Sequence, residues 1–237
     1  MAQIQKIRLP DGRVLTPGDW TSAEPLYTAI DVGAGPINTL YAFSYGIGGD
    51  IPGSPGPARS DYRWTNLEGQ GAMLPENEEL IVWNFCVSVF QMGTTDDGAA
   101  DNLAGMFLPV QPDVGLFNLL RLQRDTVCFF RIANVKDYTV HPLGYFPAST
   151  GVEQVNANAQ DPAGLHWVAG NNGGTNVADV RTLASPLYVA GGESFGIDFR
   201  FPAGQIEGLS FGADPAAADA RLRLRIFLDG YRRRPVA

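Results

Sequence analysis

A side-chain period of two runs through three segments of the chain and constrains them to β-strands. The segment 221–228, RLRLRIFL, alternates arginine with leucine or isoleucine. A helix would scatter those arginines around its whole circumference, whereas a strand puts them on one face and the apolar residues on the other. The segments 79–92, ELIVWNFCVSVFQM, and 194–201, SFGIDFRF, show the same alternation. We therefore predict a strand at each of the three.

The segment 79–92 is apolar on both of its faces. In a regular strand one face carries Ile81, Trp83, Phe85, Val87 and Val89, and the other carries Leu80, Val82, Asn84, Cys86, Ser88 and Phe90. Such a pattern is typical of a strand in the interior of a sheet that is covered on both sides. We predict that 79–92 is an inner strand.

Glycine and proline cut the rest of the chain into short pieces. The 28 glycines and 17 prolines are a larger share of the 237 residues than usual, and they exclude long helices almost everywhere. Further strands are predicted at 4–9, 25–32, 38–45, 126–135, 138–146 and 186–190. The segment 114–124 fits a short helix or a strand, and 213–220 fits one helical turn.

Long polar loops at 46–61, at 93–105 and from about Ser149 to Asp179 separate these strands. Loops of this length in a compact domain are usually functional or are ordered by a partner. About nine or ten strands with frequent turn signals indicate an antiparallel sandwich or barrel. An immunoglobulin-like module would need only about 100 residues, and a second copy would appear as a repeat, which the sequence lacks.

The predicted fold class is therefore all-β: an antiparallel β-sandwich, formed as a single jelly roll of eight strands with long decorated loops and little helix. Residues 1–237 are predicted to form this one domain. Residues 1–20 are predicted to form an N-terminal arm and residues 229–237 a basic C-terminal tail, both as assembly extensions.

The basic residues are nearly all arginines and gather at the end of the chain. Lys6 and Lys136 are the only lysines among 17 basic residues. Arginine keeps its charge when desolvated and binds carboxylate or phosphate through a planar fork of donors. The last 17 residues carry +5, against −13 for the rest, and their arginines are candidates for contact with another subunit or with nucleic acid. They are Arg221, Arg223, Arg225, Arg232, Arg233 and Arg234.

Two other interpretations of these arginines stay open. They pair with the acidic body of the same chain, or they reflect a genome rich in G and C. The pI of 4.7 and the scarcity of lysine argue against autonomous binding of nucleic acid. A tail that touches packaged nucleic acid inside an assembly is compatible with the pattern.

The sequence offers little for metal or nucleophilic chemistry. His141 and His166 are the only histidines, and neither belongs to the HxH pair that a cupin-like metalloenzyme needs. Cys86 and Cys128 lie among bulky apolar residues, so we expect buried, reduced thiols. We predict no catalytic residue, no metal, no cofactor and no enzymatic activity. No membrane span is expected, because no apolar run reaches about 18 residues.

Two weaker candidate sites lie in loops. Asp96, Asp97, Asp101 and Asn102 place four oxygen donors in a glycine-rich loop, which suits a hard cation such as calcium. Their spacing departs from that of an EF-hand loop, so a solvated polar loop is the favoured interpretation. Trp64 and Trp167 are candidates for glycan contact, and the alternative is that they anchor their loops to the body of the domain.

Several features occur together along the whole length: the arm MAQIQKIRLPDGRVLTPGDW, the strand ELIVWNFCVSVF, long Gly/Pro/Asn loops, the final strand RLRLRIFLDG and the basic end RRRPVA. In this combination the chain resembles the jelly-roll capsid proteins of tailless icosahedral bacteriophages. The resemblance implies a structural virion protein, a capsid subunit that self-assembles into an icosahedral shell. Copies of itself and other virion proteins would be its partners, and the virion its location.

The alternative prediction is a carbohydrate-binding β-sandwich, which would act as a lectin-like or receptor-binding module. A cupin-like or hydrolytic enzyme comes third, because the histidines are too few. The resemblance assigns no functional residue to any position of this chain.

Overall fold

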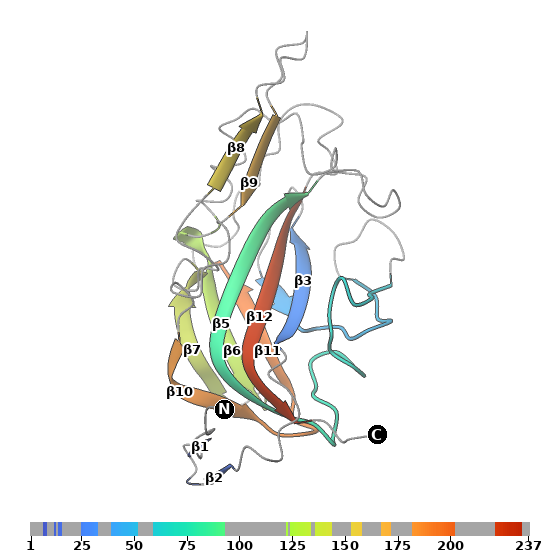
Figure 1. Cartoon of the computed structure of the whole chain (residues 1–237), viewed down its shortest axis with the longest axis vertical. Coiled ribbons are helices and arrows are strands. Elements are labelled where there is room, and N and C mark those ends of the chain that lie inside the picture. The colour runs from blue at the N-terminus through green and yellow to red at the C-terminus, as the bar shows by residue number, and fades with distance from the viewer. Residues whose placement is uncertain are drawn as a thin grey trace, which may run out of the picture.

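The described part of the chain is built almost entirely of β-strands, which form two antiparallel sheets (Figure 1). In this computed structural model the described residues are 7–8, 12, 14–15, 25–32, 39–51, 59–92, 122, 124–133, 136–143, 153–157, 167–171, 182–201 and 221–233. The predicted all-β sandwich with little helix is confirmed. Within the ambiguous segment 114–124, the two described positions, 122 and 124, are helical.

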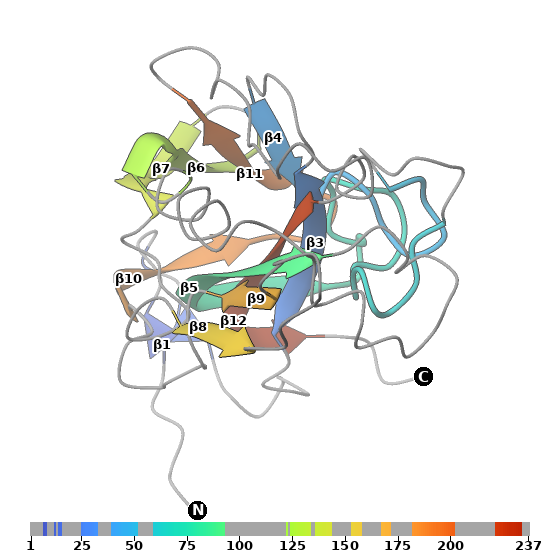
Figure 2. The ribbon, with the colours of Figure 1, turned by 90° about the horizontal axis from the view of Figure 1, so that it is seen from above.

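The larger sheet has the order β3-β12-β5-β9-β8, and β10 also pairs with β5. Its strands are β3 (Leu26–Val32), β5 (Glu79–Met92), β8 (Glu153–Ala157), β9 (Trp167–Asn171), β10 (Thr182–Val189) and β12 (Arg221–Arg233). The smaller sheet has the order β4-β11-β6-β7, with β4 (Thr39–Ala42), β6 (Val127–Ile132), β7 (Lys136–Pro142) and β11 (Phe195–Arg200). Figure 2 shows the two sheets as separate layers. A further pair, β1 (Ile7–Arg8) with β2 (Val14–Leu15), stands apart from both.

Strand pairing across the two sheets is nested. β3 pairs with β12 and β4 pairs with β11, while β5 pairs with β10 and β6 pairs with β7, all antiparallel. Two further ladders, β12 with β5 and β11 with β6, join these pairs into sheets. Early strands therefore pair with late ones, and the innermost pair is the hairpin β6–β7.

The core lies between the sheets and is filled by alternate residues of the predicted strands. Leu224, Ile226 and Leu228 of β12 are fully buried there, as are Ile197 and Phe199 of β11. The predicted alternation of 194–201 and 221–228 is confirmed. Burial of such aliphatic and aromatic side chains contributes about 1.5–3 kcal/mol each and is the main stabilising term.

β5 is an inner strand buried on both faces, as predicted, but its alternation is not regular. Asp229 pairs with Asn84 and Gly230 pairs with Val82, so Trp83 is an extra residue, a β-bulge. The core-facing residues are Leu80 and Val82 before the bulge and Phe85 and Val87 after it. The prediction of one unbroken face from Ile81 to Val89 is therefore wrong, because a bulge moves every following side chain to the opposite face.

The face of the larger sheet that points away from the smaller one, called the outer face below, is itself partly covered. Segments 45–51 and 59–67 lie beside β3 (Figure 1) and add a second apolar cluster of Ala29, Tyr45, Ile51 and Trp64. The amide of Ala29 donates to the carbonyl of Trp64 at 2.7 Å, which occupies part of the β3 edge. This cover protects an edge strand that would otherwise offer unpaired backbone groups.

The structure moves several predicted boundaries. β12 runs to Arg233, so residues 229–233 of the predicted tail are strand. β8 and β9 lie in the stretch predicted as the loop from Ser149 to Asp179. Of the predicted arm, the described residues form only the pair β1–β2. Across the part of the chain that can be described, no helix is long and apolar enough to cross a membrane.

Candidate functional site

Arg223 lies on the outer face of the larger sheet but is buried there. Its Nε lies 2.8 Å from Oδ1 of Asp31 and its NH2 lies 3.0 Å from Oδ2, so the two side chains form a bidentate ion pair. The guanidinium carbon is 3.9 Å from the ring centroid of Trp64. Both charged residues are buried. The prediction that Arg223 faces another subunit or nucleic acid is wrong in this chain, because Asp31 and Trp64 enclose it.

Arg232 is likewise internal. Its Nε donates to Oε2 of Glu78 at 2.7 Å, and its NH2 lies 2.5 Å from the same oxygen. NH1 donates to the carbonyl of Asn66 at 3.4 Å. The exposed fractions of the Arg232 and Glu78 side chains are 0% and 5%. The prediction that Arg232 contacts another subunit or nucleic acid is wrong as well, since the side chain is buried against the carboxylate of Glu78.

The other predicted arginines differ from these two. Arg233 pairs with Glu79 at 3.0 Å and keeps 44% of its side chain exposed. Arg225 is partly buried. The side chain of Arg221 and all of Arg234 lie outside the described residues. Contact of the chain end with nucleic acid stays a prediction.

The predicted glycan and cation residues are not brought together. Trp64 is only 6% exposed and lies under Arg223, so its predicted glycan contact is wrong and the anchoring interpretation holds. The Trp167 backbone belongs to β9, but its side chain lies outside the described residues. Asp96, Asp97, Asp101 and Asn102 also lie outside them.

The two thiols are buried and unbridged, as predicted. Burial raises the pKa of the Cys86 thiol to about 12, with a further contribution from the charge of Asp229. Burial also raises the pKa of Cys128. Within the described ranges, no three His, Cys, Asp or Glu side chains are grouped so that they could hold a metal ion.

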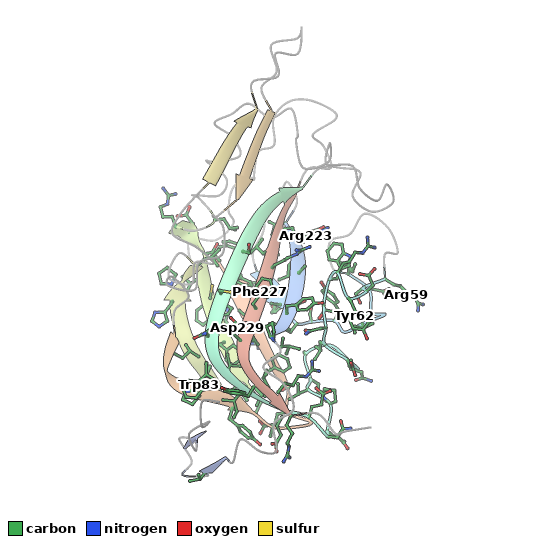
Figure 3. All side chains as sticks on the ribbon, viewed as in Figure 1. Arg59, Tyr62, Trp83, Arg223, Phe227 and Asp229 are labelled. Carbon is green, nitrogen blue, oxygen red and sulfur yellow. The ribbon has the colours of Figure 1, made fainter. Side chains whose placement is uncertain are left out.

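The bulge in β5 brings together polar groups that sequence analysis did not single out. Trp83 and Asn84 both lie between the core-facing Val82 and Phe85, and Asp229 is the register partner of Asn84. Among the described residues, Nε1 of Trp83 and Oδ1 of Asn84 are buried and have no hydrogen-bond partner. Figure 3 shows Trp83, Asp229, Phe227 and Arg223 in succession along the β5–β12 pair. We call Trp83, Asn84 and Asp229 the bulge cluster.

Asp229 is the charged member of the bulge cluster. Its carboxyl makes no hydrogen bond or ion pair with any described residue, and burial raises its pKa above the ordinary value of 3.8. Phe227 lies two residues before Asp229 on β12, so its side chain is on the same face. It packs near Tyr27, with 6.1 Å between the ring centroids. The site therefore combines an aromatic surface with a carboxylate, an amide oxygen and an indole N–H that have no hydrogen-bond partner in the described part of the chain.

A second polar cluster lies on the smaller sheet. Oδ1 of Asp198 accepts a hydrogen bond from NH2 of Arg131 at 2.6 Å, and Oδ2 accepts one from NH2 of Arg200 at 2.9 Å. The guanidinium of Arg200 lies 4.1 Å from the ring centroid of Phe129. One buried carboxylate thus holds two partly exposed arginines. The polar positions of FGIDFRF indicated Asp198 and Arg200, but nothing in the sequence indicated Arg131.

Comparison of the sequence with protein-family models and curated proteins, and of the structure with solved structures, found no match.

The Asp229→Asn variant is expected to be more stable than the wild type at neutral pH, by a margin that shrinks in acid. Because the folded pKa of Asp229 is raised, the native state binds its proton more readily than the unfolded chain does, and ionisation destabilises the fold. Through this group, stability falls as the pH rises above the ordinary value of 3.8. Below that value both states are protonated and the penalty is absent.

Urea unfolding of the wild type and of Asp229→Asn, from pH values below 3.8 up to neutral pH, measures the difference between their free energies of unfolding. The contributions of all other acids cancel in that difference. Asp50→Asn, which removes an exposed carboxylate, is the matched control and should change the free energy of unfolding by less than about 0.5 kcal/mol. A pH-independent difference between wild type and Asp229→Asn would contradict the assignment.

Proposed function

We propose that the chain is a structural subunit that assembles with copies of itself into a closed icosahedral shell, and that its sandwich is a jelly roll. The nested strand pairing carries the proposal. Counted in chain order from β3, and leaving out β8 and β9, the eight sandwich strands pair first with last, second with seventh, third with sixth and fourth with fifth.

This pairing is that of one long antiparallel hairpin rolled into two sheets. The rolled hairpin yields the orders β3-β12-β5-β10 and β4-β11-β6-β7, and both agree with the observed ladders. Double Greek keys of this kind occur in viral capsid domains and also in lectins and cupins. Because a fold does not by itself imply a function, the choice among these classes depends on the surface.

The surface favours assembly. Tyr62, Tyr41 and Met73 are 65%, 54% and 42% exposed. Tyrosine and methionine are enriched where protein surfaces meet. Figure 1 shows the hairpin β8–β9 beyond one end of the β5–β12 pair, which it joins through the register pair Phe90 and Asn171. An extension of this kind gives neighbouring subunits an additional surface for contact.

Proposed partners are copies of the chain and other virion proteins, and the proposed location is the virion. Of the six predicted arginines, those at the chain end are the ones proposed for contact with packaged nucleic acid. Arg233 is exposed there, and Arg234 follows it in the sequence. Each phosphate contact would add a salt-dependent increment to the affinity.

Purified full-length protein is expected to form large particles, visible by electron microscopy and measurable by light scattering. Tyr41→Glu and Tyr62→Glu should each shift the population toward small species, because a carboxylate buried in an interface without a partner is strongly unfavourable. Gln70→Glu adds the same charge at another exposed position and is the control.

A folded wild-type monomer at micromolar concentration would contradict the proposal. Particles that both tyrosine variants leave unchanged would contradict the placement of Tyr41 and Tyr62 in the contacts between subunits. Circular dichroism of each variant separates loss of assembly from loss of fold.

A further inference from the structure

We infer that the side of the smaller sheet that faces away from the core binds acidic side chains of a second copy of the chain. The inference rests on the proposed function and deepens it, because it names the surface and the chemistry that join neighbouring subunits. Five residues on strands β4, β6 and β11 form this surface, which we call the arginine surface. They are Tyr41, Phe129, Arg131, Asp198 and Arg200.

The register of three adjacent strands brings these side chains together (Figure 2). Asp198 on the central strand β11 is the register partner of Tyr41 on β4 and of Phe129 on β6. Arg131 and Arg200 follow two positions along β6 and β11, so their side chains lie on the same face. The alternate residues of the same strands are buried in the core between the sheets.

The charges on the arginine surface do not balance. Asp198 accepts hydrogen bonds from both guanidinium groups, at 2.6 Å from Arg131 and 2.9 Å from Arg200. Neither arginine forms an ion pair with any other described carboxylate. Asp137 is the register partner of Arg131 on β7, and its side chain lies outside the described residues. Among the described groups, one positive charge therefore remains for a further carboxylate.

Both arginines are accessible and already held in place. Their side chains are 40% exposed at Arg200 and 30% exposed at Arg131, whereas that of Asp198 is 3% exposed. The guanidinium of Arg200 also lies 4.1 Å from the ring centroid of Phe129, and Tyr41 beside them is 54% exposed. Side chains that are fixed before binding lose little conformational entropy when a partner arrives.

The charge of the chain selects the partner. The 237 residues carry a net charge of −8, so a second copy offers an excess of carboxylates. Asp50 and Glu76, for example, are exposed and form no ion pair with a described residue. A carboxylate matches the planar fork of donors of an arginine. Tyrosine and arginine are also the residues that carry much of the binding energy at protein interfaces.

Nucleic acid fits this surface less well than a second copy does. Affinity for a phosphate backbone grows with the number of phosphates that cationic groups neutralise. The arginine surface has two arginines, and Asp198 already neutralises one of the two charges. One net positive charge is sufficient for a single carboxylate of a neighbouring subunit.

Sedimentation of the nuclease-treated full chain over a range of concentrations tests the inference. Arg131→Gln and Arg200→Gln should each weaken self-association about tenfold or more, as loss of a hydrogen bond to a charged group does. Each variant leaves the other arginine on Asp198, and circular dichroism checks that the fold is intact. Arg233→Gln is the matched control, because it removes an arginine of similar exposure, 44%, from the larger sheet and should leave self-association unchanged.

A second pair of variants tests the surface without removing an arginine. Thr39 on β4 is the register partner of Arg200, and the Cβ atoms of such partners lie about 4.5–5.5 Å apart. Thr39→Glu should therefore supply the missing carboxylate within the chain and weaken self-association as the arginine variants do. Thr39→Gln has nearly the same shape without the charge and should associate as the wild type does.

Equal self-association of Arg200→Gln and Arg233→Gln, or of Thr39→Glu and Thr39→Gln, would overturn the inference. Loss of nucleic-acid binding with unchanged self-association would also overturn it, and would identify a phosphate site. Particles that persist unchanged in all these variants would leave the shell proposal intact and contradict only this contact. Small oligomers that the arginine variants dissociate, in the absence of particles, would support the contact and contradict the shell. A chain that stays monomeric would contradict both.

Discussion

Arg232→Ala is expected to lower the free energy of unfolding by about 3–5 kcal/mol, because it leaves the buried carboxylate of Glu78 without its partner. Arg232 is fully buried and lies on the same side of β12 as Leu228. Its guanidinium also donates to the carbonyl of Asn66, so the substitution opens a polar cavity at that end of the core. The ion pair joins residues 154 positions apart in the sequence, so it connects the start of β5 with the end of β12.

Urea unfolding monitored by circular dichroism measures the effect. Arg233→Ala is the matched control, since it removes the neighbouring arginine from an exposed pair with Glu79 and should change stability by less than about 1 kcal/mol. The double variant Arg232→Met with Glu78→Leu should recover most of the loss, because it leaves no charge unpaired. Equal effects of Arg232→Ala and Arg233→Ala would show that the buried pair has no special role.

The strands were predictable where side chains alternate strictly. In β11 and β12 the apolar residues occupy every second position and face one core, so pattern alone finds both elements. In β8 and β9 the sequences EQVNA and WVAGN have too few apolar residues to show a period. Their strand character arises from pairing with each other and with β5, which is tertiary context.

The bulge was not predictable because Trp83 is apolar and continues the alternation of its neighbours. A residue that fits either face carries no sign of an inserted position. The only local indication lies on the partner strand, where Asp229 and Gly230 interrupt the alternation of 221–228. The bulge cluster was missed for the same reason, since its members come from two strands that meet only in the fold.

The role of the arginines depended on partners distant in sequence. Arg223 and Asp31 are 192 positions apart, and the alternation of 221–228 shows only that Arg223 lies opposite the core face. The alternation does not show whether this face contacts solvent, another subunit or a second apolar cluster. In the structure, segments 45–51 and 59–67 cover the face around Arg223. The charge distribution indicated that these arginines could pair with the acidic body of the chain, but it could not show that Asp31 is the partner of Arg223.

Gly230→Ala is expected to destabilise the fold by about 3 kcal/mol or more, as steric overlap with the main chain commonly does. A Cβ at this position would overlap the carbonyl oxygen of Ile81 and lie 2.8 Å from its carbonyl carbon. The neighbouring backbone has little room to retreat, because the ladder between β12 and β5 continues on both sides of Gly230 and β3 holds β12 up to Leu228. Glycine is thus required where the bulge at Trp83 brings the two main chains together.

Gly196→Ala, in the equally central strand β11, is the matched control for this prediction. Its new Cβ would meet the carbonyl oxygen of Ala42 at 3.5 Å, an ordinary contact. Loss of glycine flexibility from the unfolded chain should then keep the change within about 1 kcal/mol. Thermal unfolding of the two variants compares them directly. If both were equally stable, the bulge would have to tolerate a side chain at position 230, and close approach of the backbones would not be what selects glycine there.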